Sequence, residues 1–197
     1  MKKAVLTVTI LLVAVLSTAC INNFAVQELN NKAKEYLDKG NFDAAISRLQ
    51  SSLDLDSSIF ETHYNLGIAL TNAERYKEAI DSFHKAINLR PETKETYYSL
   101  AVAQENYART LFLRKYDTVK NSDGTIKKVP VTKEFIISLF NDALSSYEKV
   151  ISLNSSVDDM DISKKQIESI KTDISSVNDA VWIENPEQVQ ETPKLAN

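Results

Sequence analysis

Few residues in this chain have the types and spacings that could do chemistry. The two histidines, His63 and His84, lie far apart and lack the spacing of metal ligands. Three aspartates superficially suggest a calcium site: Asp158, Asp159 and Asp161. They lack the glycine and the distal glutamate of a calcium-binding loop, so helix capping is the favoured interpretation. The sequence contains neither a glycine-rich phosphate loop nor a G-x-S-x-G motif. We therefore expect no enzyme activity, no cofactor and no metal site.

The elements that must position any functional residue are helices with a repeating pattern. Between Phe60 and Pro91, small residues fall where two helices would touch, and large residues fill the gaps between them. The small residues are Gly67, Ala79 and Ala86, and the large ones are Leu66, Tyr76, Phe83 and Leu89. The three- and four-residue spacing is typical of one apolar helical face, and Pro91 ends the second helix. The pattern resembles the tetratricopeptide repeat, a helix–turn–helix unit of about 34 residues that stacks into a solenoid.

The same frame recurs over residues 26–59, 60–93 and 94–155. The first copy departs at Ser57, where the family has proline. In the third copy the first helix is in place, whereas the second helix is displaced by an insertion at residues 109–133. The resemblance therefore implies an all-α solenoid of about three helical hairpins. Such a stack presents a surface, which favours a binding module.

The insertion, residues 109–133, is predicted to form an extended helical finger. No helix breaker interrupts residues 102–116, so the first helix of the third repeat can continue well beyond its usual end. Thr132 is a suitable N-cap for a second helix that starts at Lys133. Asp123-Gly124 lies between two short β-prone arms and indicates a small hairpin or ordered loop at the tip.

The finger is basic, although the whole chain has a net charge of −4. Seven basic residues against two aspartates give residues 109–133 a net charge of +5. The candidate contact residues are Arg114, Lys115, Lys120, Lys127 and Lys128. Such a finger could meet anionic lipid head groups or an acidic partner. A solvated loop whose lysines keep it soluble is the simpler alternative, and the sequence leaves both open.

Residues 1–19 are predicted to form a lipoprotein signal peptide. Two lysines precede an apolar stretch that is too short for a comfortable membrane span. The stretch ends in Leu-Ser-Thr-Ala-Cys and resembles a bacterial lipobox, although Leu16 lies one position further from the cysteine than usual. Cys20 is the only cysteine, so it is the expected site of lipid (palmitate) attachment, with residues 20–25 as a lipidated tether. Plain secretion and an uncleaved anchor are the alternatives.

Residues 156–183 are predicted to form a helix that caps the stack. Ser163 with Gln166 is expected to form a capping box near its start. Its apolar residues lie on one face: Ile162, Ile167, Ile170, Ile174, Val177 and Val181. An amphipathic helix that binds a partner is the alternative interpretation. Residues 184–197 are polar and carry two prolines, so we expect a disordered tail.

The resemblance implies a concave groove lined by the first helix of each repeat. The candidate binding residues in this groove are Asn30, Lys34, Tyr64, Asn65, Ile68, Tyr98 and Val102. An aromatic and aliphatic strip of this kind suits a peptide with apolar anchors. Some family members clamp a C-terminal carboxylate with basic residues of the first and third repeats. The third repeat has no basic residue on this face, so we predict against the binding of chaperone tails.

The most specific interpretation is a non-catalytic scaffold or adaptor that binds another envelope protein or peptide through its groove. A lipid on Cys20 would hold it in the membrane of a bacterial cell envelope, on the extracytoplasmic side, facing the periplasm where there are two membranes. One alternative is a structural lipoprotein that self-associates. Another is peripheral contact with a lipid surface through residues 109–133. No nucleic-acid partner is expected.

Overall fold

The computed structural model describes residues 23–153, 156–180 and 182. The predicted signal peptide, Cys20 and the predicted tail at 184–197 lie outside these residues. None of the described helices has the length and apolar content needed to cross a membrane.

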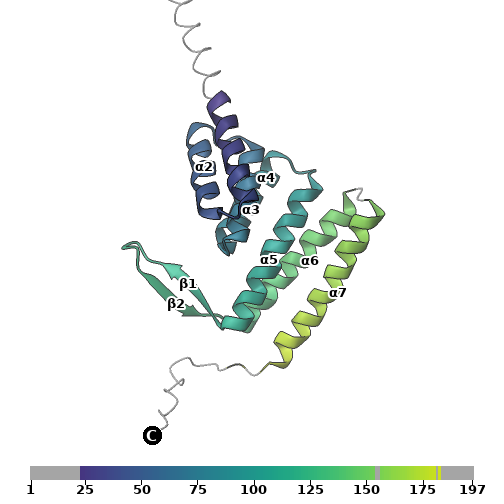
Figure 1. The fold of residues 1–197 in the computed structure, drawn as a ribbon. Coiled ribbons are helices and arrows are strands. Elements are labelled where there is room, and N and C mark those ends of the chain that lie inside the picture. Colours follow the sequence, from purple (N-terminus) through teal and green to yellow (C-terminus); the bar gives the residue numbers. More distant parts are fainter. Residues whose placement is uncertain (1–22, 154–155, 181, 183–197) are drawn as a thin grey trace, which may run out of the picture.

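Three helical hairpins and a last helix follow one another along the described chain (Figure 1). The first hairpin pairs a helix over residues 23–38 with α2 (Phe42–Leu55), and the second pairs α3 (Phe60–Asn72) with α4 (Tyr76–Leu89). The third pairs α5 (Lys94–Arg114) with α6 (Lys133–Ser152), and α7 (Val157–Asp179) packs beside α6. The prediction of an all-helical solenoid with a capping helix is confirmed.

The turn inside each hairpin explains why the third hairpin is longer. Gly40 ends the first helix with a φ of 70°, and Glu74, one repeat later, ends α3 with a φ of 57°. The next equivalent position is Ala108, which is fully buried within α5. The helix continues through Ala108 to Arg114, and the chain turns at Lys115 instead, with a φ of 61°.

The predicted finger is confirmed as two long helices joined by a β-hairpin (Figure 1). Helix α5 has 21 residues against 13 in α3, and α6 has 20 against 14 in α4. Strands β1 (Tyr116–Lys120) and β2 (Ile126–Pro130) pair antiparallel, with Thr118 opposite Lys128. As predicted, Thr132 caps α6, because its hydroxyl accepts a hydrogen bond of 3.2 Å from the Phe135 N–H.

The hairpin turn follows from the chemistry of Asp123 and Gly124. The Gly124 N–H donates to the Asn121 carbonyl over 3.0 Å, and Gly124 has a φ of 85° that favours glycine. The Asp123 carboxylate accepts hydrogen bonds from the Thr125 N–H and hydroxyl, at 2.9 and 2.6 Å. A turn followed by a left-handed glycine is a common three-residue hairpin loop.

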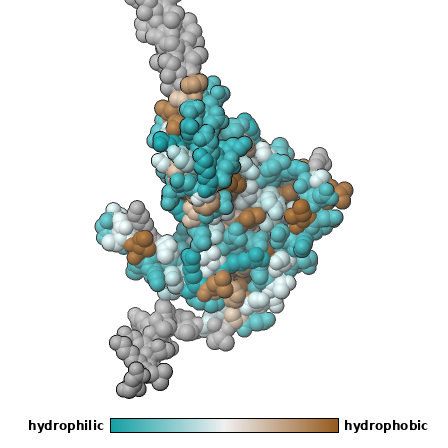
Figure 2. Space-filling model, in the orientation of Figure 1, coloured by the Kyte–Doolittle hydropathy of each residue, from teal (hydrophilic) through white to brown (hydrophobic). Residues whose placement is uncertain are grey.

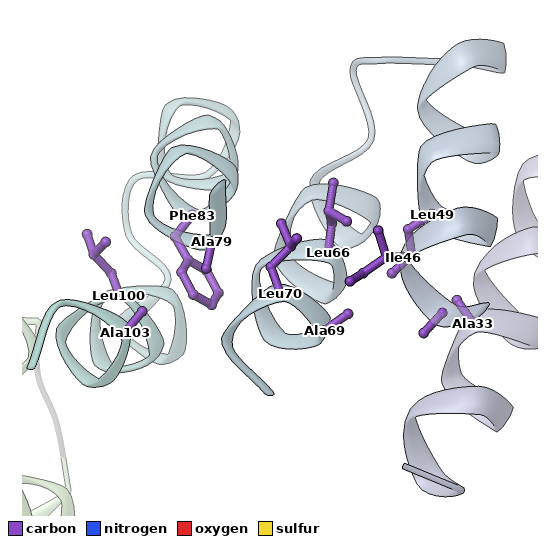
Figure 3. Packing of buried hydrophobic residues seen from close by; sticks show 11 residues of the cluster. Ala33, Ile46, Leu49, Leu66, Ala69, Leu70, Ala79, Phe83, Leu100 and Ala103 are labelled. Carbon is purple, nitrogen blue, oxygen red and sulfur yellow. The ribbon is translucent and has the colours of Figure 1, made fainter. Parts of the chain in front are cut away.

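The core consists of two apolar clusters that meet at α5. The first lies within the first two hairpins and reaches Leu100 and Ala103 of α5 (Figure 3). Phe83 is fully buried at its centre, beside Ala79 on the same face of α4 (Figure 3). The second cluster holds the finger helices to α7 and includes Phe140, Tyr147, Ile170 and Val177, all fully buried.

The start of α7 differs from the prediction. The predicted capping box of Ser163 with Gln166 is wrong, because α7 begins about two turns earlier and Ser163 is fully buried inside it. Ser156 and Asp159 form the capping box instead: the Asp159 N–H donates to the Ser156 hydroxyl over 3.2 Å, and the Asp159 carboxylate accepts from the Ser156 N–H over 3.3 Å. Of the three aspartates predicted to cap a helix, Asp159 is confirmed in that role.

Candidate functional site

A pocket of about 390 Å³ lies where the first turns of α5 and α7 come together beside α3. Its walls come from four helices, so no short segment of sequence contains it. The lining residues are Tyr64, Lys94, Glu95, Tyr98, Ser99, Val150, Asp159 and Ile162. The pocket is therefore an aromatic and aliphatic hollow with charged groups at its edge.

The two tyrosine rings are held by neighbours that fix their orientation. Tyr64 stacks on Phe60 with ring centroids 5.9 Å apart and meets the edge of Phe83 at 6.1 Å. Tyr98 meets the fully buried Tyr147 ring edge-on at 5.6 Å. Because each ring is packed on one side and half exposed on the other, a ligand finds an ordered apolar surface at small entropic cost.

The pocket is lined by two carboxylates and one ammonium group. The Lys94 ammonium donates to the Asp159 carboxylate over 2.6 Å. The hydrogen bond from Lys94, with a second from Ser156, lowers the pKa of Asp159 to about 2, and the same contact raises the pKa of Lys94. Glu95 lines the pocket, is exposed, and forms no ion pair within the described residues. Only one of the two carboxylates is therefore paired with the ammonium.

The seven predicted groove residues lie in different surroundings: some line the pocket, some pack against the core, and one is exposed. Tyr64 and Tyr98 line the pocket. Ile68 packs against the first core cluster and Val102 against the second, while Asn65 is half-buried outside the pocket. Lys34 is exposed and lies outside the pocket.

Asn30, the remaining predicted groove residue, joins three helices. Its side-chain nitrogen lies 2.9 Å from the Val26 carbonyl, the Ser52 hydroxyl and the Thr62 hydroxyl. Since Ser52 and Thr62 are fully buried on α2 and α3, the Asn30 amide satisfies polar groups inside the stack. These contacts point to a structural role for Asn30.

The pocket also contains residues that the sequence did not single out, above all those of α7. Asp159 and Ile162 line it, and Ile162 keeps 48% of its surface exposed although it was expected on the packed face of the helix. The helix after α6 occupies the place of a first helix of a fourth repeat, so its first turn faces the groove. The only signal in the sequence was the Ser156–Asp159 pair, which fixes where α7 begins.

Most of the basic side chains in the predicted finger contact other groups of the protein. Arg114 pairs with Glu74 at 3.0 Å, the Lys115 ammonium lies 4.1 Å from the Trp182 ring centroid, and Lys128 lies 4.4 Å from that of Tyr116. Burial lowers the pKa of Lys115. Lys127 is exposed and has no partner among the described residues. The Lys120 side chain lies outside the described part.

The hairpin is also held against the second repeat. The Asp117 carboxylate accepts a hydrogen bond of 2.7 Å from the Tyr107 hydroxyl and pairs with Lys77 of α4. Burial opposes ionisation of Asp117, but the hydrogen bonds from Lys77, Tyr107 and the Thr118 N–H outweigh it and lower its pKa. Figure 2 shows a mostly hydrophilic surface with separate hydrophobic spots, one of them on the projecting hairpin, where Ile126 is 73% exposed.

A buried polar cluster joins α5 to α6 and α7. The Glu105 carboxylate is 5% exposed, accepts a hydrogen bond of 2.9 Å from the Tyr147 hydroxyl, and pairs with Arg109 at 2.8 Å. Arg109 also pairs with Asp173 of α7 at 2.8 Å. Burial raises the pKa of Glu105, while Arg109 and Tyr147 act in the opposite direction. The cluster ties the capping helix to the finger.

The described residues bring no group of three His, Cys, Asp or Glu side chains into a geometry that could hold a metal ion. His63 is buried on α3, and its Nε2 lies 2.8 Å from the Ser57 carbonyl. These contacts are those of a packed histidine.

Family models and solved structures agree with the pattern of the helices. A tetratricopeptide repeat model matches residues 60–92, and a TPR repeat model matches residues 33–73. The chain has the fold of a tetratricopeptide-repeat solenoid. No curated protein matches it. Together the two models match residues 33–92, which is most of the first two hairpins, whereas the third hairpin is recognised through its structure.

Solved TPR domains share the fold of this TPR solenoid. The first TPR domain of human RPAP3 superposes with a TM-score of 0.56 at 15% identity, covering 79% of this chain and 97% of that one. The first TPR of Spaghetti (RPAP3), bound to an HSP90 peptide, gives 0.55 at 15% identity, with 76% and 93% covered. The Sgt2 TPR domain from Aspergillus fumigatus gives 0.54 at 14% identity, with 87% and 90% covered.

Proposed function

We propose that this TPR solenoid is a non-catalytic scaffold that binds a peptide segment of a partner protein between α3, α5 and α7. The observation that carries the proposal is the pocket in which Tyr64 and Tyr98 present ordered rings beside the exposed Ile162 side chain. Aromatic side chains in such hollows commonly supply most of the binding energy of an interface. A solved TPR domain of the same fold holds a peptide, which supports this choice.

The shape of the pocket favours a peptide. Its volume of about 390 Å³ is at the small end for a site that encloses a whole small molecule. It accommodates one or two side chains of a longer chain that continues along the neighbouring first helices of the repeats. The half-buried Asn65 and Ile68 of α3 would be reached by such a continuation.

We further propose that Cys20 carries lipid and anchors the protein in a bacterial cell envelope, with the repeats outside the cytoplasm. The lipobox-like sequence before Cys20 and the lack of any other cysteine support this. The described helix already includes residue 23, so the repeats would lie close to the membrane surface. The partner would then be another envelope protein.

The groove is tested by photo-crosslinking in the native cell. A photo-reactive residue at Tyr98 is expected to capture one discrete partner, because that ring lines the pocket. The same residue at Lys127, exposed on the hairpin, is the control site and is expected to give no such product. Mass spectrometry identifies the product. Capture of the same partner from Lys127 only, or of nothing but a second copy of this chain, would rule out the groove as the binding site.

A matched pair of substitutions measures how much the groove contributes to the affinity for the partner. Tyr98→Ala is expected to weaken binding of the captured partner at least about tenfold, as for a central aromatic anchor. Tyr97→Ala removes an equal side chain from the adjacent position, which lies outside the pocket, and is expected to change affinity less than about threefold. Equal losses from both substitutions would contradict the assignment.

The anchor is tested separately with Cys20→Ala. We expect this variant to leave the membrane fraction, because one triacylated cysteine supplies more than the two hydrophobic signals needed for stable attachment. Mass spectrometry of the mature N-terminal peptide is expected to show acyl chains on Cys20 in the native protein. An unmodified cysteine there, or an unchanged membrane fraction for Cys20→Ala, would remove the anchor from the proposal and leave the groove untouched.

A further inference from the structure

We infer that the groove selects a peptide with a lysine or arginine next to an apolar side chain. This inference rests on the proposed function, since it specifies the partner of the same pocket. It follows from the charged groups and the aromatic rings that line the pocket.

Lys94 is the one cation among the described residues that line the pocket. Its ammonium lies 2.6 Å from the Asp159 carboxylate, which also accepts a hydrogen bond of 2.7 Å from the Ser156 hydroxyl. Asp159 is fixed in the capping box of α7, so the contact is built into the start of that helix. An acidic ligand would have to displace a carboxylate that is already well placed, so Lys94 is a poor receptor for a negative group.

Within the described part of the chain, one carboxylate of the pocket remains unpaired. Glu95 lies in the first turn of α5, lines the pocket, and forms no ion pair among the described residues. With Lys94 and Asp159 paired, the formal charge of the lining is −1. The N-terminal ends of α5 and α7 each contribute about half a positive charge, and Asp158, a second acidic residue in the first turn of α7, offsets this, so the pocket stays negative. A ligand carboxylate would be repelled here, and a cation attracted.

The two tyrosine rings of the pocket also favour a cation. The faces of Tyr64 and Tyr98 are the negative parts of their quadrupoles, so a guanidinium or ammonium group gains from lying over them. Arginine fits best, because its flat group can stack on a ring while it donates to Glu95. Ile162 is 48% exposed, so the neighbouring side chain of the peptide can pack against its apolar surface. The unpaired carboxylate, the tyrosine rings and the exposed Ile162 together favour a peptide in which a basic residue lies next to an apolar one.

The experiment uses the purified full-length protein in detergent and a random heptapeptide library displayed on phage. The wild-type protein is expected to enrich peptides in which arginine or lysine neighbours leucine, isoleucine or phenylalanine. Selected peptides, labelled with fluorescein, are then titrated against variants. Glu95→Lys is expected to weaken the basic peptides about fivefold or more, the effect of about one partly exposed ion pair, and Glu95→Gln is expected to give a smaller loss.

Glu92→Lys is the matched control, because Glu92 is exposed in the turn before α5 and does not line the pocket. It makes the same charge change and is expected to alter affinity less than about twofold. Equal losses from Glu95→Lys and Glu92→Lys would show a general charge effect and overturn the inference. Enrichment of acidic or uncharged peptides would overturn it as well.

The same experiment separates this inference from the proposed function. If the selected peptides lose affinity with Tyr98→Ala but show no basic preference, the groove binds peptides and the charge argument fails. If no selected peptide depends on Tyr98, the groove itself is not a peptide site and both proposals fall. Because Glu95 is exposed in the first turn of α5, Glu95→Lys is expected to lower the unfolding midpoint only slightly and Glu95→Gln less, which denaturation of each variant checks.

Discussion

Gly67→Ala is expected to lower the free energy of unfolding by about 1–3 kcal/mol, the usual cost of an extra methyl group in a packed core. An alanine Cβ at this position would lie 2.6, 2.7 and 2.8 Å from three atoms of the Phe83 ring. Phe83 is fully buried and in edge contact with Tyr64, so the ring cannot move away without disturbing the first core cluster. Alanine favours the helix by about 1 kcal/mol over glycine, which is too little to compensate.

Urea unfolding of Gly67→Ala and of two companion variants checks this result. Gly40→Ala is the control, because Gly40 has positive φ but no atom within 4 Å of a new Cβ. Its expected cost is therefore the backbone term alone, about 1–2 kcal/mol. Phe83→Leu combined with Gly67→Ala is expected to recover part of the loss by making room. A stabilised Gly67→Ala protein would contradict the close approach of α3 and α4.

Gly67 illustrates which parts of the fold the sequence predicts well. The spacing of small and large residues within 60–91 is local, and it places Gly67 where the helices touch, as the structure confirms. The finger was predictable for a similar reason. The helix continues through Ala108, and Asp123-Gly124 and Thr132 carry their own turn and capping chemistry.

The pocket was less predictable, because its composition depends on how α7 packs. Tyr64 and Tyr98 follow from the repeat frame, whereas Asp159 and Ile162 enter only because α7 starts at Val157. Nothing in the spacing of residues says that Lys94 and Asp159 will pair across the fold. The basic finger shows the same limit, since a sum of charges cannot show that Arg114 already has a partner in Glu74.

Removing the cation of the buried cluster is expected to have the other large effect on stability. Arg109→Met leaves the Glu105 carboxylate, 5% exposed, without its ion pair, and removes the link to Asp173. Breaking a buried pair from one side typically costs about 3–5 kcal/mol, and we expect about 2–3 kcal/mol here because Arg109 is itself partly exposed. The loss is measured as the difference in the free energy of unfolding.

Arg114→Met is the matched control for Arg109→Met. It makes the same change on the same helix, but its ion pair with Glu74 is exposed, so its expected cost is below about 1 kcal/mol. Glu105→Gln in the Arg109→Met background is expected to recover most of the loss, since a neutral amide can still accept from the Tyr147 hydroxyl. Equal costs for the two arginine variants would show that Glu105 gains nothing from its pair.

The pH dependence of the stability deficit provides an independent test of the Glu105–Arg109 pair. Burial raises the pKa of Glu105 in the folded protein, and Arg109 opposes that shift. A carboxyl with a raised folded pKa binds its proton more tightly when folded, so its unfavourable contribution is absent at low pH and grows as the pH rises past the unfolded value. Without Arg109 the shift becomes larger, and the deficit of Arg109→Met is therefore expected to increase from pH 4 to pH 8. Urea unfolding across this range should show no such trend once Glu105→Gln is added, because the amide does not titrate. A deficit that shrinks with rising pH would mean that Glu105 is not the group that Arg109 stabilises.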